Sequence, residues 1–251
     1  MDTLRKDDRG AQVRQLQKLL AQRGYAADVT GAFDTKTWQA ARAFQTQNLD
    51  QHGQPLVVDG VVGPLTWWSL QHPKPFIRTP SAVDYATLPA RGGTRRGRAA
   101  LAAAIGELKA NAREIGGDNR GPFVRKYLTP AGLDEGNSWC AGFVSWCFMQ
   151  ASSGGKAAMP LAYVASARSL LAELKQQGWS SAPGSGYVPV PGDVVVWWRV
   201  SLAGWLGHTG LVHSVQDGML YTIEGNHSPR VQGFSYVLSR MEKLLGYGHV
   251  P

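Results

Sequence analysis

The stretch Gly136-Asn-Ser-Trp-Cys-Ala-Gly-Phe-Val-Ser-Trp-Cys-Phe148 holds both cysteines of the 251-residue chain. Its apolar residues recur every three or four positions, which predicts a helix from Cys140 to Gln150. Cys140 begins this helix, where the positive end of the helix dipole favours a thiolate and therefore a nucleophile. Cys147 lies two turns further on and is predicted to be a small buried hydrophobe. The two cysteines are roughly 10 Å apart along the helix axis, which is too far for a disulfide.

A nucleophilic thiol requires a base, and the histidines supply the candidates. His208 begins a predicted strand directly after Gly207, whose missing side chain allows another backbone to approach closely. His213 lies five residues on, so the alternation of a strand turns it to the opposite face. The next predicted strand ends at Glu224 and Asn226, which lie beside His208 if the two strands form a hairpin. These polar groups are candidates to orient the imidazole and to stabilise its charged form.

The elements around these residues change in kind along the chain. Helical spacing from Leu101 to Ile115, closed by Gly116 and Gly117, predicts one helix, and another is predicted from about Tyr163 to Gln177. The later residues form β-rich runs separated by Gly, Pro and Asp, at 193–198, 209–215, 219–224 and 234–238. Helices first and strands later predict an α+β fold with an antiparallel sheet.

Four ordered motifs carry a family resemblance over about residues 100 to 250. They are Trp139-Cys-Ala-Gly-Phe-Val144, Val190-Pro-Gly-Asp-Val-Val195, Gly207-His-Thr-Gly-Leu-Val212 and Ile223-Glu-Gly-Asn226. Together they resemble the CHAP domain, the cysteine amidohydrolase and peptidase family related to NlpC/P60 and papain-like folds. The resemblance implies that Cys140 is the nucleophile, that His208 is the general base and acid, and that Glu224 is the orienting third member. It places Asn226 as a polar residue of the same site.

The residue before the nucleophile departs from the family pattern. Many CHAP sequences have glutamine there, whereas this chain has Trp139. We expect Trp139 and Asn137 to bind substrate, with Asn137 or Ser138 assisting the backbone N–H of Cys140 in holding the oxyanion. The calcium-binding acidic loop of some relatives is missing, because the acidic residues ahead of the cysteine lack regular ligand spacing: Asp118, Asp134 and Glu135. We expect no metal and no cofactor.

The N-terminal part contains an internal repeat. Residues 29–38 and 58–67 share Val, Gly, Thr and Trp at equivalent positions, which predicts one small pseudo-symmetric unit. In each copy a Gly-containing turn leads into a helix, with Asp34 as the N-cap of the first and Pro64 at the first position of the second. Helical spacing from Val13 to Leu20, with Gly24 after its end, predicts a third helix.

This unit resembles the peptidoglycan-binding domain 1 family over residues 4 to 70. The matching residues are Gly10-Ala-Gln-Val13, Leu16-Gln17, Leu20, Gly24-Tyr25, Gly31-Ala-Phe33, Thr37-Trp38, Phe44-Gln45 and Asp59-Gly-Val-Val-Gly-Pro-Leu-Thr-Trp67. The resemblance implies a three-helix module that holds the stem peptide and sugar of the bacterial cell wall without cutting it. It suggests Asp59, Gly60 and Thr66 as wall contacts, although most of the matching residues are core and turn formers.

The charge of the chain is concentrated between the two units. Lys and Arg number 26 against 18 Asp and Glu, a net charge of +8 that favours an anionic partner. Six basic residues and one acidic residue fall in residues 73–98, a Pro- and Gly-rich stretch that is predicted to be a connector. The predicted organisation is a binding domain at 1–72, this basic connector, and a catalytic domain at 99–251. Nucleic acid is disfavoured because no recognisable binding motif accompanies the arginines.

The two resemblances together predict a peptidoglycan hydrolase that cuts an amide bond. The bond is either the N-acetylmuramoyl-L-alanine amide or a peptide bond of the stem or cross-bridge. Both are amides, so the catalytic residues do not choose between them, and amidase is only slightly favoured. The alternative from another class is a non-catalytic wall-binding protein, against which the intact set of Cys140, His208 and Glu224 argues. We expect a monomer whose partner is peptidoglycan.

The segment Met1–Arg9 lacks the apolar stretch of a signal peptide, and no apolar run approaches the ~18 residues that cross a bilayer. We therefore expect synthesis in the cytoplasm and action on the periplasmic wall after release. Two routes remain open at this point: a phage endolysin released by a holin, and an effector delivered by a secretion system with the same chemistry.

Overall fold

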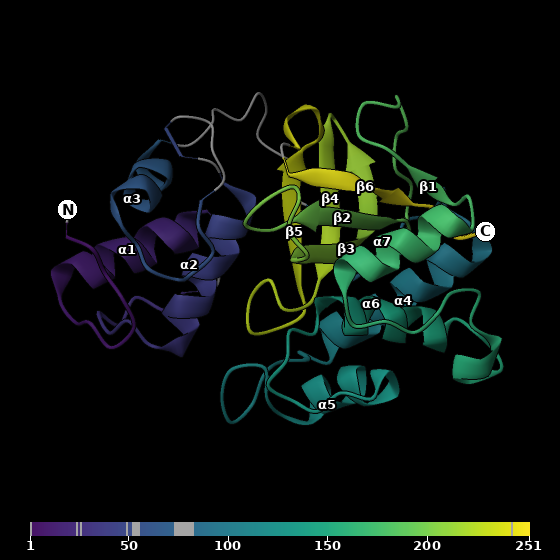
Figure 1. Cartoon of the computed structure of the whole chain (residues 1–251), viewed down its shortest axis with the longest axis horizontal. Helices are drawn as coiled ribbons and strands as arrows, with labels where there is room; N and C mark the ends of the chain where they lie inside the picture. The colour runs from purple at the N-terminus through teal and green to yellow at the C-terminus, as the bar shows by residue number, and fades with distance from the viewer. Residues whose placement is uncertain are drawn as a thin grey trace.

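The N-terminal unit is a bundle of three helices, as predicted (Figure 1). The computed structural model describes residues 2–23, 25, 27–48, 50–51, 56–72, 83–241 and 243–251. The helices are α1 (Ala11–Gln22), α2 (Thr35–Gln47) and α3 (Pro64–Gln71). Asp34 caps α2 by accepting a hydrogen bond from the Thr37 N–H at 2.8 Å, and Pro64 occupies the first turn of α3. The predicted end of the first helix at Gly24 lies outside the described residues.

The repeat has a structural cause in two buried glutamines. Gln17 Oε1 accepts from the Gly31 N–H at 2.8 Å, while its Nε2 donates to the Thr37 hydroxyl at 2.9 Å. Gln45 repeats these bonds with the Gly60 N–H at 2.8 Å and the Thr66 hydroxyl at 3.3 Å. The expected wall-contact role of Gly60 and Thr66 is therefore corrected, because their polar groups hold a buried turn; Asp59 is exposed.

The larger unit joins helices to one six-stranded antiparallel sheet, which confirms the predicted α+β class. The strands run in the order β1-β6-β2-β3-β4-β5. The helices are α4 (Arg95–Lys109), α5 (Pro122–Leu128), α6 (Cys140–Gln150) and α7 (Ala167–Gln176), with short 3-10 turns at Thr129–Ala131, Gly155–Ala158 and Leu238–Arg240. The strands are β1 (Ser180–Ser181), β2 (Val194–Trp198), β3 (Gly207–Gln216), β4 (Met219–Glu224), β5 (Gln232–Val237) and β6 (Leu244–Gly248).

Helix α4 differs from its prediction at both ends. It begins at Arg95, so the last four residues of the predicted connector are helical, and Thr94 caps it by accepting from the Gly97 N–H at 2.9 Å. It ends at Lys109, because Asn111 adopts a left-handed backbone conformation with a φ of 52°. Residues 73–82 of the connector lie outside the described residues.

The sheet has one core on each face because its strands alternate. Val194 and Val196 of β2 pack into the large core formed with α4, α6 and α7. Val195 and Trp197 point to the other face, where they form a second cluster with residues of β3, β4 and β6. Figure 1 shows α4, α6 and α7 gathered on one side of the sheet. Helix α6 is thereby fixed against β3, the strand that carries His208.

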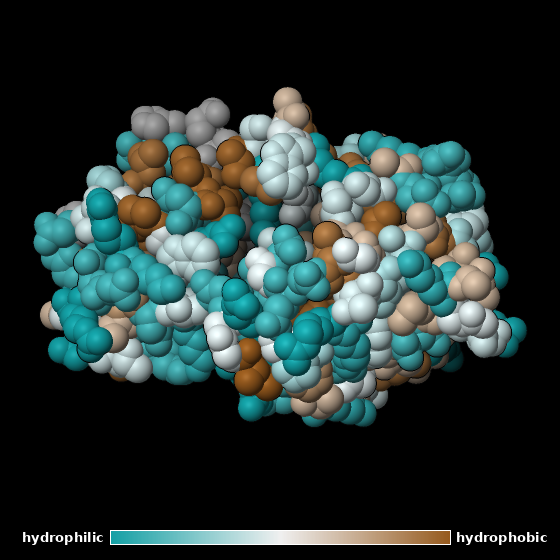
Figure 2. All heavy atoms as spheres, turned by 60° about the horizontal axis from the view of Figure 1, so that its bottom comes forward, coloured by the Kyte–Doolittle hydropathy of each residue, from teal (hydrophilic) through white to brown (hydrophobic). Residues whose placement is uncertain are grey.

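The face of the molecule drawn in Figure 2 is mainly polar. Hydrophilic side chains cover most of the face drawn in Figure 2, with smaller hydrophobic patches between them. None of the helices in the described part of the chain is long and apolar enough to cross a membrane.

Helix α2 is the part of the N-terminal bundle that contacts the larger unit. Gln39 on α2 donates to Asp118 at 3.0 Å and also to Glu114. Lys243, directly before β6, donates from Nζ to the Gln45 carbonyl at 2.7 Å. The Tyr25 ring, just after α1, lies 5.5 Å from the His227 ring between centroids. The bundle therefore packs beside the strand ends that carry the candidate catalytic residues.

Candidate active site

Cys140 is the first residue of α6, as predicted, and its side chain is only 3% exposed. The backbone N–H of Thr209, next to His208 on β3, donates to the thiol. Burial nevertheless raises the pKa of Cys140 above its ordinary value, although the nearby Arg199 charge acts to lower it. The expected lowering by the helix start is therefore outweighed, because desolvation disfavours the thiolate more strongly than these favourable contacts stabilise it.

His208 and Glu224 form a fully buried pair on the neighbouring strands β3 and β4. His208 Nε2 lies 2.7 Å from Glu224 Oε2, as the predicted hairpin of β3 and β4 requires. Gly207 permits the packing, because a Cβ there would lie 3.0 Å from the Trp197 carbonyl oxygen. Burial lowers the pKa of His208 to about 3, so the ring is neutral near pH 7. Its Nε2–H then donates to Glu224, leaving a lone pair on Nδ1.

Glu224 accepts hydrogen bonds on both of its oxygens. Oε2 accepts from His208 and His227, and Oε1 accepts from the hydroxyls of Thr222 at 2.5 Å and Tyr236 at 2.7 Å. Burial acts to raise the pKa of this carboxyl, but the attraction of His227 and the hydrogen bonds from both imidazoles outweigh it, so the pKa is lowered. The group is thus an ionised carboxylate held by four donors.

Sequence reasoning missed two further residues of the site, Arg199 and His227. Arg199, directly after β2, is 8% exposed, and its Nη2 lies 2.9 Å from His208 Nδ1. His227 is 2% exposed and follows Asn226 in the turn after β4. The spacing of three residues between Glu224 and His227 was a usable signal for their contact. Arg199 gave no such signal, because its place depends on how β2 pairs with β3.

Asn226 holds the beginning of α6 in place. Its Oδ1 accepts from the Trp139 backbone N–H at 3.1 Å, and its Nδ2 donates to Asn119 at 2.7 Å. Its backbone has a φ of 61°, a left-handed conformation that asparagine tolerates better than most residues do. Asn226 therefore positions the segment that carries Cys140.

The residues beside the cysteine that were expected to bind substrate lie in different surroundings in the structure. The expectation that Trp139 binds substrate is corrected, because its side chain is fully buried. The ring stacks on Tyr127 and donates from Nε1 to Glu114 at 2.9 Å. It supports the site from the protein interior. Asn137 is exposed and donates to the Asp134 carbonyl at 3.1 Å, while Ser138 lines a small cavity at the site.

This cavity lies between α2 and residues that contact the candidate catalytic groups; Cys140, His208 and Glu224 themselves are not part of its lining. It is lined by Trp38, Gln39, Arg42 and Ala43 of α2 and by Asn119, Ser138, Arg199, Asn226, His227 and Ser228. Among the described residues, its lining includes buried polar atoms without a hydrogen-bond partner, such as Gln39 Oε1, Arg199 Nε and His227 Nε2. The cavity is therefore polar and incompletely satisfied.

The remaining histidines of the larger unit have structural partners. His213 is bonded to the Thr87 carbonyl at 2.9 Å, and His249 to Asp193 at 2.8 Å. His52 of the N-terminal unit lies outside the described residues. His208, Glu224 and His227 are close enough together to ligate one metal ion, with ligand atoms within 4.8 Å of one another. Such an ion would have to displace the hydrogen bonds that join these same atoms.

Family models match a segment of each unit. Residues 132–226 match the family model of the CHAP domain, and residues 9–70 match that of the putative peptidoglycan binding domain. Both resemblances predicted from the sequence are thereby confirmed. No curated protein matches the chain.

Two solved structures are similar to parts of the chain. The Burkholderia AP3 phage endolysin is 31% identical over 48% of this chain and 41% of its own, with a TM-score of 0.25. The protein Ly7917 is 20% identical over 50% of this chain and 60% of its own, with a TM-score of 0.36. The chain thus spans only about half of the length of these relatives.

Proposed function

We propose a function from the premise that this chain contains a putative peptidoglycan binding domain followed by a CHAP domain. The protein is a peptidoglycan hydrolase, in which the first domain holds the cell wall and the second cuts an amide bond. The observation that carries this proposal is the arrangement of Cys140 at the start of α6, next to the β3 strand whose His208 is paired with a buried carboxylate.

The proposed reaction is acyl transfer through a thioester. His208 Nδ1 takes the Cys140 proton, and the thiolate attacks the amide carbonyl carbon. The backbone N–H of Cys140, at the positive end of α6, stabilises the oxyanion. His208 then gives its proton to the leaving amine, and a water molecule that it deprotonates releases the acyl group. Glu224 stabilises the imidazolium that exists between these steps.

The cut bond is proposed to be the N-acetylmuramoyl-L-alanine amide, with a peptide bond of the stem or cross-bridge as the alternative. Both bonds are amides, and the same residues serve either reaction. Product analysis separates them, because an amidase leaves the glycan unmodified and generates new L-alanine amines, whereas an endopeptidase leaves muramic acid linked to a peptide fragment.

The test of the mechanism is hydrolysis by the wild type and by Cys140→Ala. We expect the variant to lose at least about a thousandfold in rate, because removing a nucleophile removes the covalent route. Purified peptidoglycan is the substrate, and mass spectrometry identifies the products. Cys147→Ala is the matched control and should retain activity. Equal hydrolysis by the wild type and Cys140→Ala would refute the proposed cysteine mechanism.

The tethering role of the first domain has a separate test. Deleting residues 1–72 should weaken co-sedimentation with insoluble peptidoglycan, since a tether raises the local substrate concentration toward the millimolar range. Hydrolysis of small soluble muropeptides should persist. Unchanged co-sedimentation would contradict the tether.

A further inference from the structure

Arg199 is a buried cation, and no carboxylate among the described residues is hydrogen-bonded to its guanidinium. Its side-chain hydrogen bond is with His208 Nδ1, a neutral acceptor, and its Nε has no partner in the described part of the chain. The carboxylate of Glu224 is engaged by four other groups. Burying a guanidinium without a directly bonded carboxylate costs free energy of folding, so a buried arginine at this place requires a functional explanation.

The surroundings of Arg199 indicate what it can bind. It lines the cavity beside the catalytic residues, together with the unpartnered His227 Nε2 and the polar side chains of Ser138 and Asn226. A guanidinium presents parallel N–H groups whose spacing matches the two oxygens of a carboxylate. The stem peptides of peptidoglycan carry free carboxylates within a few bonds of their amides, so a substrate of the proposed function supplies such a group.

We propose that Arg199 forms a substrate carboxylate subsite, and that occupation of this subsite releases His208 to act as the base. This inference rests on the proposed function and deepens it. In the structure the Nδ1 lone pair accepts the Arg199 Nη2–H. A lone pair so occupied does not accept the thiol proton of Cys140. When a carboxylate takes the Arg199 N–H groups, Nδ1 becomes free, and the proton moves from Cys140 Sγ to Nδ1.

The consequence is a site that distinguishes its substrates by charge. A stem peptide with a free carboxylate beside the cut amide both binds Arg199 and frees the base. The same peptide with that carboxylate converted to a carboxamide does neither as well, because it is neutral and offers a single acceptor oxygen. Hydrogen bonds to charged groups give a difference of about ten- to a hundredfold in kcat/KM.

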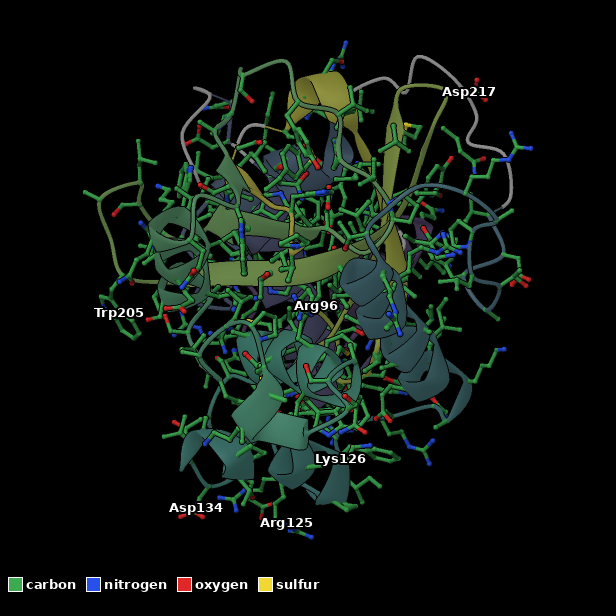
Figure 3. All side chains as sticks on the ribbon, turned by 90° about the vertical axis from the view of Figure 1, so that its right-hand side faces the viewer. Arg96, Arg125, Lys126, Asp134, Trp205 and Asp217 are labelled. Atoms are coloured by element: carbon green, nitrogen blue, oxygen red, sulfur yellow. The ribbon has the colours of Figure 1, made fainter. Side chains whose placement is uncertain are left out.

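The test compares soluble muropeptides in the free-carboxylate and carboxamide forms. The wild type should prefer the free form by about ten- to a hundredfold, and Arg199→Gln should lose that preference. Arg199→Lys keeps the charge without the paired N–H groups and should show an intermediate preference. Arg96→Gln is the matched control, since Arg96 is exposed on α4, on the face drawn in Figure 3.

Binding provides a readout that does not depend on turnover. In a Cys140→Ala background, calorimetric titration should show tighter binding of the free form, and adding Arg199→Gln should abolish the difference. The subsite would be overturned if folded Arg199→Gln kept the wild-type preference for the free-carboxylate form. It would also be overturned if the wild type hydrolysed both forms at equal rates. Hydrolysis that survives in Cys140→Ala would instead count against the proposed function, so the two failures are distinguishable.

Discussion

Glu224 sets the chemistry of its neighbours at the scale of single residues. Its two oxygens accept from two imidazoles and two hydroxyls, so the carboxylate is satisfied only while all four donors stay in place. The ionised Glu224 and the neutral His208 both depend on the surrounding protein. Each must therefore change its protonation when acid unfolds the chain.

Acidification is expected to destabilise the fold through this pair. His208 has a pKa of about 3 when folded against 6.5 when free, so between these values only the unfolded chain binds the proton. Glu224, with its lowered pKa, stabilises the fold above the ordinary carboxyl pKa, and that contribution is lost as the pH falls. Urea unfolding should therefore show a free energy of unfolding that drops as pH falls from 6.5 toward 3. His208→Gln should flatten the drop, whereas the exposed His72→Gln should not.

At the scale of elements, the hairpin of β3 and β4 determines how His208 and Glu224 lie relative to each other. Gly210 on β3 lies against Glu224, where an added Cβ would come within 2.5 Å of Glu224 Cγ. The hairpin can bring His208 and the carboxylate together only because this position has no side chain. The element is therefore specified by a glycine as well as by its β-rich residues.

Gly210→Ala should displace Glu224. We expect a loss of about 1–3 kcal/mol in the free energy of unfolding from overpacking, together with reduced hydrolysis. The matched control is Gly106→Ala in α4, where a Cβ meets nothing within 4 Å. That change should be neutral or stabilising by up to about 1 kcal/mol, since alanine favours a helix interior. Wild-type activity in Gly210→Ala would show that Glu224 can shift without cost.

Sequence patterns predicted the helices and strands that depend on residues close together in the chain. The helix at Cys140 and strands β2, β3, β4 and β5 followed from periodicity and turn residues. Strand β6 did not, because two glycines in five residues give it little strand propensity, and pairing with β2 creates it. Arg199 was missed for the same reason, because the pairing of β2 with β3 places it in the site. The burial that raises the pKa of Cys140 is also a property of the assembled fold.

At the scale of the whole molecule, a few side chains of α2 and of the larger unit form the contact between the two domains. It places α2 over the cavity and buries Lys243 against the Gln45 carbonyl and the Trp198 ring. Burial, with a smaller effect of the Arg199 charge, lowers the pKa of Lys243 to about 7. Because the free lysine has a pKa near 10.5, docking of the domains releases a proton between these values.

Domain docking should consequently strengthen as pH rises from 7 to about 10.5. Small-angle scattering should show a radius of gyration that decreases over this range. Lys243→Met removes the titrating group while keeping an apolar stem, so its docking should not change with pH there. An identical pH dependence in Lys243→Met would assign the effect to other groups.

The burial of Cys140 bears on how the protein survives before it meets its substrate. Peroxide and disulfide reagents attack the exposed thiolate, and this sulfur is both shielded and protonated in the structure. Cys147, the other cysteine, is completely buried. The molecule should therefore tolerate aerobic storage without reductant, with both thiols remaining unmodified.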